Sequence, residues 1–178
     1  EKIIESLPGV GKNIGPALLG EIENVNRFSS QAHFRSLMGI VPKQDDSGQR
    51  RKKGLHMSYD GSGRFRYLYY LAADTARQWD PQLAKIYYEG MVNKGKSHTE
   101  ALVPVMAASA NRTIAVLKRG TPYEFKDPEG NPISKREARV LVKNFYTVPE
   151  HVRKRTRNKK SQKREERRSP QFGKRQPE

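Results

Sequence analysis

The residues best suited to chemistry lie in a polar, glycine-rich stretch, residues 40–63. Ser47-Gly48 is followed by four consecutive cations, Arg50, Arg51, Lys52 and Lys53. Such a run could hold a phosphodiester and spread the negative charge that develops on it during a reaction. A neighbouring serine hydroxyl could act as a nucleophile once a base or a metal activates it. On these residues alone a solvated linker is the simpler interpretation, because Ser-Gly pairs are common in loops.

Further contacts to a phosphate backbone come from the end of this stretch. Ser58 lies near its end, and Arg64 and Arg66 follow at the start of a predicted helix. A connection of this length without secondary structure is uncommon in a compact domain, and it usually carries function or is disordered. Residues 40–63 are therefore the candidate functional loop.

A second phosphate-binding feature precedes the loop. Leu7-Pro8-Gly9-Val10-Gly11 separates a short apolar segment from a predicted helix over residues 14–22. This pattern is typical of a helix-hairpin-helix, here residues 1–24, whose glycines permit positive φ and close backbone approach. Free amides at the start of the second helix would bind phosphate, and Lys12 would add charge. Gly9, Gly11 and Lys12 are thus candidate nucleic-acid ligands; a plain structural turn is the alternative.

The charge of the whole chain agrees with a nucleic-acid partner. Its 178 residues include 35 Lys and Arg against 19 Asp and Glu, a formal net charge of +16. Such an excess indicates a polyanion as partner. No apolar stretch is long enough to cross a membrane, and no strongly amphipathic basic helix stands out, so we expect DNA or RNA and no membrane. The absence of cysteine excludes thiolate metal sites, and the four histidines have no ligand spacing, so no metal site is expected.

The positive charge is concentrated at the C-terminal end. Residues 151–178 hold twelve basic and three acidic residues and little that could be buried. We expect a disordered basic tail that grips nucleic acid without specificity, or one that only solubilises the chain. Because the chain begins with Glu1, already inside an apparent helix, we interpret it as the C-terminal portion of a longer intracellular protein.

The elements that must position these residues are predicted to be helical. Ser29 or Ser30 caps a short helix that ends at Gly39, and the stripe from Phe65 to Ala76 predicts a helix from Arg64 to Trp79. Pro81 starts the next helix, and the capping box Ser97-x-x-Glu100 opens a long one toward Lys118, with Pro104 as a possible kink. Trp79 is expected to pack rather than to stack on a base.

These elements predict an all-α fold. The hairpin, the loop of residues 40–63 and a small helical bundle over residues 64–119 make one domain, residues 1–125. A small helical extension over residues 126–150, with a helix from Ser134 to Phe145, precedes the basic tail of residues 151–178.

An ordered set of short motifs carries a family resemblance. They are Ser6-Leu7-Pro8-Gly9-Val10-Gly11, Arg27-Phe28, Gly39-Ile40-Val41-Pro42, Ser47-Gly48, Met57-Ser58, Gly61, Arg66, Leu71-Ala72, Gly95-Lys96, Ala101-Leu102-Val103 and Leu117-Lys118-Arg119-Gly120. In order and spacing, over about residues 3–125, they resemble the C-terminal domain of insertion-sequence transposases of the insertion sequence 110 type, which include Piv-like DNA invertases.

The resemblance implies a specific chemistry. Members of the family are prokaryotic DNA recombinases that are guided by a structured bridge RNA and act as oligomers on paired DNA. Their C-terminal domain supplies a serine that attacks the scissile phosphate and forms a covalent link, and this serine corresponds to Ser47. Four acidic ligands for metal, expected to be magnesium, belong to an N-terminal RuvC-like domain. The chain itself would then carry no cofactor, would be inactive alone, and would act in the cytoplasm at the nucleoid.

Departures from the family pattern leave alternatives open. Ser58-Tyr59-Asp60-Gly61 stands where the family usually has Ser-Lys-Arg-Gly, and residues 126–178 have no counterpart that can be placed. Asp45 and Asp46 are expected to play no part. A noncatalytic helix-hairpin-helix module that only binds nucleic acid is the main alternative. A base-excision glycosylase is disfavoured, because the second hairpin helix is followed by Asn24-Val25-Asn26-Arg27 instead of a catalytic Asp.

Overall fold

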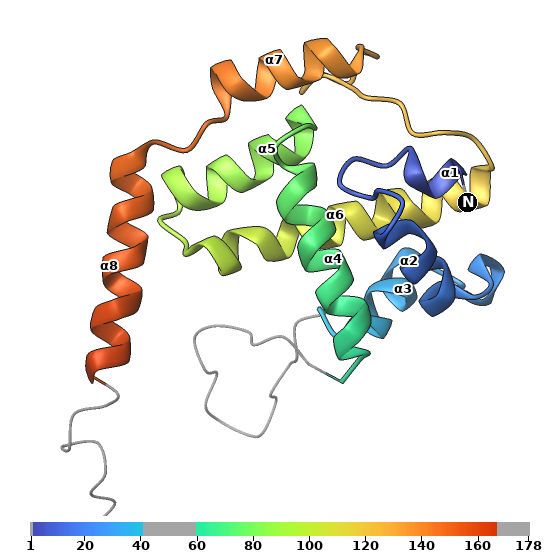
Figure 1. The fold of residues 1–178 in the computed structure, drawn as a ribbon, viewed down its shortest axis with the longest axis horizontal. Coiled ribbons are helices and arrows are strands. Elements are labelled where there is room, and N and C mark those ends of the chain that lie inside the picture. Colours follow the sequence, from blue (N-terminus) through green and yellow to red (C-terminus); the bar gives the residue numbers. More distant parts are fainter. Residues whose placement is uncertain (1, 41–59, 167–178) are drawn as a thin grey trace, which may run out of the picture.

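A computed structural model of the chain describes residues 2–40 and 60–166 (Figure 1). The expected all-α fold is confirmed over these residues, where the only pairing of extended backbone is an isolated bridge between Lys126 and Pro132. The helices are α1 (Lys2–Glu5), α2 (Ile14–Ile22), η1 (Val25–Arg27), α3 (Gln31–Leu37), α4 (Gly63–Ala76), α5 (Pro81–Tyr88), η2 (Glu89–Asn93), α6 (His98–Arg119), α7 (Lys135–Phe145) and α8 (Glu150–Glu166).

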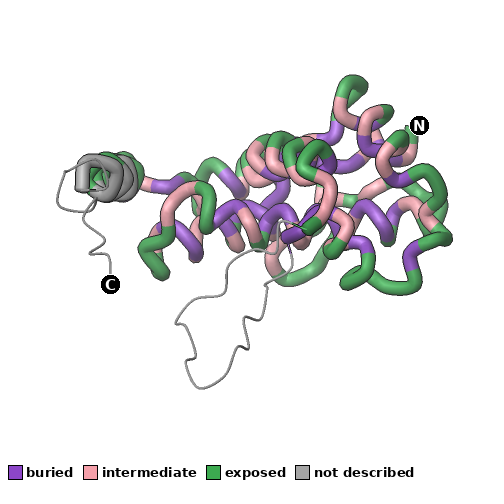
Figure 2. Tube along the Cα trace, turned by 90° about the horizontal axis from the view of Figure 1, so that it is seen from below, coloured by how far each residue is buried: buried purple, intermediate pink, exposed green. Residues whose placement is uncertain are grey.

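Helix α6 is the central element of the bundle. Helices α1, α3, α4 and α5 all pack against it, and Leu102, Val105 and Ile114 are buried along its length. The predicted capping box forms: the Ser97 hydroxyl accepts from the Glu100 amide, and the Glu100 carboxylate accepts from the Ser97 amide. Pro104 lies inside the helix, and Gly120 ends it with φ of 71°. Buried residues run through the interior of this bundle (Figure 2).

Four aromatic rings join the N-terminal helices to α4. Phe34 of α3 meets Phe28, Phe65 and Tyr69 edge to face, with centroid distances of 4.9, 5.6 and 6.2 Å. Edge-to-face pairs add to the stability that burial of the rings already provides. All four rings are at most 2% exposed, so the aromatic stripe of α4 forms core, as its spacing predicts.

A buried polar network holds the start of α5. Asp80 caps the helix by accepting from the Leu83 amide (2.9 Å), and its other oxygen accepts from the Tyr123 hydroxyl (2.6 Å). Arg112 of α6 pairs with the same oxygen at 2.9 Å. Asp80 is wholly buried, and these three partners compensate the loss of water around its charge.

The expectation of a disordered tail from His151 is wrong over its first part. Helix α8 continues to Glu166, and the predicted small helix is α7. Lys, Arg and Glu are strong helix formers, and a Glu150–Lys154 ion pair of 2.9 Å adds support one turn apart. Val148 and Val152 are buried and attach the start of α8 to the bundle. Residues 167–178 lie outside the described part of the chain.

Candidate nucleic-acid interface

The predicted hairpin is present as α1, a turn and α2. Leu7 and Val10 are buried in this turn, and Gly9 has φ of 79°. A Cβ at Gly9 would lie 2.0 Å from the carbonyl oxygen of Ala72 in α4. The close approach that the sequence predicts therefore occurs, but against the protein's own helix. Gly9 therefore packs the hairpin onto α4, and the residue itself stays partly exposed.

In the turn before α2, the exposed residues are Gly11, Lys12 and Asn13. Positive φ at Gly11, which the motif led us to expect, does not occur, and a Cβ there would meet nothing within 4 Å. Asn13 does not cap α2 with its side chain, the Gly15 amide bonds the Gly11 carbonyl at 2.8 Å, and Pro16 has no N–H. The amides of Asn13 and Ile14, beside Lys12, are therefore the donors that this helix start could offer to a phosphate.

The two ends of the candidate loop are joined to each other. The Ser62 amide donates to the Leu37 carbonyl at 2.8 Å, and a Cβ at Gly61 would lie 2.2 Å from the same oxygen. Arg66 donates to the Met38 carbonyl at 3.0 Å. Ile40, the last described residue before the gap, is buried. The end of α3 and the start of α4 therefore lie side by side, at the two flanks of residues 41–59.

The same junction is attached to the hairpin. Glu21 of α2 accepts from the Ser62 hydroxyl at 3.3 Å and pairs with the Arg64 guanidinium at 3.5 Å. Ser62 also caps α4 by accepting from the Phe65 amide at 3.1 Å. A single carboxylate therefore connects the second hairpin helix to the exit of the loop.

The two arginines of this junction that were predicted as phosphate ligands differ in exposure and in the partners that they bind. The Arg64 side chain is 74% exposed and can reach a phosphate by giving up a weak surface pair. Arg66 is partly buried and serves the fold through Met38. The remaining predicted ligands, Arg50, Arg51, Lys52, Lys53 and Ser58, and the predicted nucleophile Ser47, lie outside the described residues.

One feature that the sequence reasoning missed is a cleft between α5 and α7. Trp79, expected to pack, lies in the turn before α5 with the Arg139 guanidinium 4.3 Å and the Lys135 ammonium 5.1 Å from its ring centroids. The spacing of Lys135 and Arg139, four residues apart, could have indicated a basic face on this helix, because such residues lie on the same side of a helix.

Two negative findings concern the described residues only. Their His, Asp and Glu side chains form no group of three or more that could hold a metal ion. None of the described helices combines the length and the apolar character needed to cross a membrane.

Comparison with known proteins gives a consistent family. Residues 1–89 match the model described as the transposase IS116/IS110/IS902 family. The chain is similar to an uncharacterized 43.6 kDa protein of insertion element IS110 from Streptomyces coelicolor, with 30% identity over 72% of this chain and 31% of that protein.

Two further relatives extend the comparison. An uncharacterized 44.8 kDa protein of insertion element IS116 from Streptomyces clavuligerus is 31% identical over 65% of this chain and 28% of its own length. The pilin gene-inverting protein of Moraxella bovis is 23% identical over 68% of this chain and 38% of its own length. The chain thus spans about a third of the length of the curated relatives that it matches.

Proposed function

Because this chain belongs to the IS116/IS110/IS902 transposase family, we propose that it is the part of a DNA transposase that holds nucleic acid and supplies a serine nucleophile. The pilin gene-inverting protein, a relative named for inverting a gene, supports a reaction that cuts and rejoins DNA. The nucleophile in this proposal is Ser47, at the position that corresponds to the family's serine.

The observation that carries the proposal is the closure of the segment that contains Ser47. Both its flanks meet at the Leu37–Ser62 hydrogen bond, beside α2 of the hairpin. Ser47 follows Ile40 by seven residues, so full extension keeps it within about 25 Å of this junction. Nucleic acid held at Arg64 would therefore lie within reach of the serine, which favours a productive encounter.

The proposed step exchanges one phosphoester bond for another. The Ser47 oxygen attacks phosphorus, loses its proton to a base, and forms a P–O bond to the protein while the bond to one DNA end breaks and that end takes up a proton. The covalent link conserves the bond energy, so attack by another DNA end can rejoin the strand without a nucleotide cofactor. The cations Arg50, Arg51, Lys52 and Lys53 would stabilise the charge on the phosphate.

A magnesium site is not part of this proposal for the described residues. Their carboxylates and histidines do not gather in the way that a metal ion requires. In this proposal the magnesium ligands belong to an N-terminal domain of the full-length protein, as the family resemblance implies. The same resemblance supports a structured guide RNA as a partner, a homo-oligomer as the active form, and action at the prokaryotic nucleoid. In this proposal the 178-residue chain alone does not recombine DNA.

The proposal is tested by Ser47→Ala in the full-length transposase. Strand exchange should be lost while DNA binding persists, because the change removes one oxygen and no charge. Ser161→Ala, an exposed serine of α8, is the matched control and should recombine at the normal rate. Normal recombination by the Ser47→Ala protein would refute the assignment.

The alternative is a binding module without catalysis. The net charge of +16 favours it as well as it favours the transposase. It requires DNA affinity that falls steeply with salt and that is the same with and without the Ser47 hydroxyl. Gel shifts over a salt series, run beside the strand-exchange assay, separate the two functions.

A further inference from the structure

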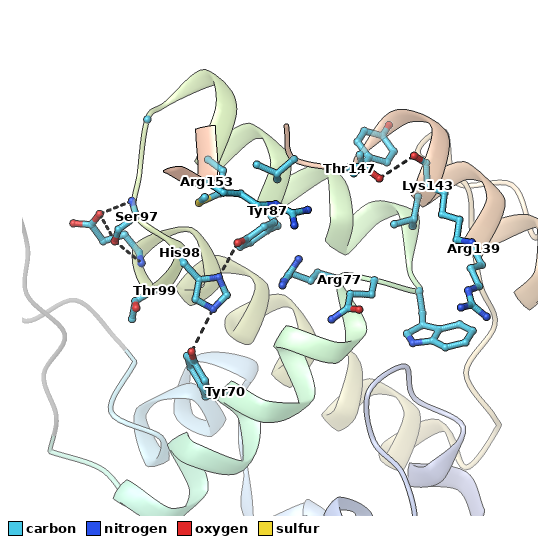
Figure 3. Close-up of a pocket in the computed structure, with 18 residues that line it drawn as sticks. Tyr70, Arg77, Tyr87, Ser97, His98, Thr99, Arg139, Lys143, Thr147 and Arg153 are labelled. Atoms are coloured by element: carbon cyan, nitrogen blue, oxygen red, sulfur yellow. Dashed lines mark hydrogen bonds between the residues drawn. The ribbon is translucent and has the colours of Figure 1, made fainter. Parts of the chain in front are cut away.

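A large cleft separates the bundle from the C-terminal helices. Its volume is about 1050 Å³, and residues of α4, α5 and the turn between them face residues of α7 and α8 across it (Figure 3). The start of α6, at Ser97 and His98, closes one end. The family match stops at residue 89, so α7 and α8 contribute a wall that lies beyond it.

The lining of the cleft is strongly basic. Four cationic side chains and one acidic side chain line it, and the acid, Glu100, is engaged in the capping box of α6. The cations are Arg77, Arg139, Lys143 and Arg153. A concave surface with this excess of positive charge concentrates anionic ligands.

Two of these cations lie over aromatic rings. The guanidinium carbon of Arg139 lies 4.3 Å from the Trp79 ring centroid, and that of Arg77 lies 4.2 Å from the Tyr87 ring centroid. A guanidinium carries five N–H donors, which suit phosphate oxygens. Arg77 uses N–H donors on Asp74, at 2.7 Å. Arg139 and Lys143 are exposed on α7 and face the cleft, so a ligand can reach them.

The opposite wall is a row of rings that the fold holds in place. His98 lies between two tyrosines, with Nδ1 2.7 Å from the Tyr87 hydroxyl and Nε2 3.3 Å from the Tyr70 hydroxyl (Figure 3). Tyr146, directly after α7, meets Tyr88 edge to face at 6.1 Å. Tyr87 is buried beneath Arg77 and fixes His98, so the lining rings that a base can reach are the partly exposed Tyr70, His98 and Tyr146. Stacking on such rings does not depend on which base is present.

We propose that this cleft binds a single strand of nucleic acid, with phosphates at Arg139 and Lys143 and bases against the aromatic wall. Unpaired bases can use the rings, whereas a duplex keeps its bases stacked on each other and offers only its backbone. The residues that line the cleft lie between Tyr70 and Arg153 in the sequence, and the cleft extends the proposed function by adding a place for an unpaired strand. Single-stranded DNA and RNA share the chemistry that this cleft recognises.

Trp79 makes the site directly observable. It is the only tryptophan in the chain, and it lies in the cleft. We would titrate the 178-residue chain with unlabelled oligo-dT, oligo-rU and a blunt duplex of about 12 nucleotides each, and record tryptophan emission. Either single strand should quench the emission on binding, and the two curves show which is preferred. The duplex should bind, as followed by anisotropy of a labelled strand, without a comparable change in emission.

Matched variants of α7 test the phosphate contacts. R139A/K143A should raise the Kd for the single strand about tenfold, and the slope of log K against log salt should fall by about 1.4, or 0.7 for each lost phosphate contact. Arg136→Ala removes an exposed cation of the same helix that does not line the cleft, and the Kd should stay within about twofold of the parent chain.

A second variant separates binding from folding, because Arg139 also packs on Trp79. Lys143→Glu reverses an exposed charge, so it should leave the thermal midpoint unchanged and still weaken single-strand binding. Binding without a change in Trp79 emission, or equal losses in R139A/K143A and Arg136→Ala, would overturn the proposal. In the Ser47→Ala protein, either single strand should quench Trp79 emission as it does in the parent chain. The cleft proposal can therefore hold or fail independently of the assignment of Ser47 as nucleophile.

Discussion

The loop junction and the α5–α7 cleft use their cations differently. At the junction, Arg66 donates to the Met38 carbonyl and helps to hold α3 and α4 together, while Arg64 makes only an exposed pair with Glu21. In the cleft, Arg139 lies over a ring and Lys143 is exposed, so both can meet a ligand. A basic residue next to a functional segment, such as Arg66, can therefore be structural. Cations distant from that segment in sequence, such as Arg139 and Lys143, can be better placed for binding.

The largest expected effect on stability comes from Asp80, the buried carboxylate that pairs with Arg112. Asp80→Ala removes three hydrogen-bonding partnerships and leaves Arg112 without its carboxylate, so the free energy of unfolding should fall by about 4 kcal/mol. Urea denaturation followed by circular dichroism measures it. Glu129→Ala, an exposed acid in a turn, should change stability little. Equal, small losses would show that the network does not stabilise the fold.

Substitution of the two hairpin glycines should change the free energy of unfolding by different amounts in the same assay. Gly9→Ala places a methyl group against the Ala72 carbonyl at positive φ, and should cost more than about 2 kcal/mol. Gly11→Ala adds a methyl group in open space and should be nearly neutral. If Gly11→Ala weakened DNA binding without loss of stability, the turn would have a direct role in holding nucleic acid. Similar stabilities for the two variants would contradict the packing role of Gly9.

The two junction arginines give a smaller contrast. Arg66→Ala leaves the Met38 carbonyl without its donor and should lower stability by about 1.5 kcal/mol. Arg64→Ala removes an exposed pair and should cost less than about 0.5 kcal/mol, but it should reduce the salt dependence of DNA binding. The reverse outcome, with Arg64 stabilising the fold and Arg66 setting DNA affinity, would break the distinction between structural and ligand-facing cations.

The smallest expected effect is a pH dependence. Burial raises the pKa of Tyr69 well above its usual range, so above about pH 10 the folded state retains a proton that the unfolded state has lost. Stability should therefore fall as the pH rises through that region. Tyr69→Phe should reduce the slope of this decline, and Tyr67→Phe, which removes an exposed tyrosine, should not. Parallel declines in all three proteins would contradict this cause.

Helix patterning predicts most of this fold because the signals are local. Ser97-x-x-Glu100 and Ser134 mark helix starts, and the spacing from Phe65 to Ala76 marks a buried face. The helix over Glu150–Glu166 differs from the predicted disorder, because its low hydrophobicity indicates disorder while its residues favour helix and Val152 supplies an anchor.

The candidate site was less predictable, because its geometry depends on contacts between distant segments. Arg66 reads as a phosphate ligand in sequence, and only the position of the α3 terminus shows that it bonds Met38. The cleft brings Trp79 and His98 together with Arg139, which no local pattern relates. The prediction of a functional segment over residues 40–63 stays a prediction, and the hydrogen bond between Leu37 and Ser62 joins its two flanks.

The central claim, that Ser47 is the nucleophile, is tested most directly by trapping the covalent intermediate. Full-length protein would be incubated with DNA carrying a nick that prevents rejoining, digested, and mapped by mass spectrometry. If Ser47 is the nucleophile, a nucleotide will be attached to the peptide that contains Ser47, and it will be absent from the Ser47→Ala protein. Attachment at another residue, or strand exchange without any protein–DNA adduct, would show that Ser47 is not the nucleophile.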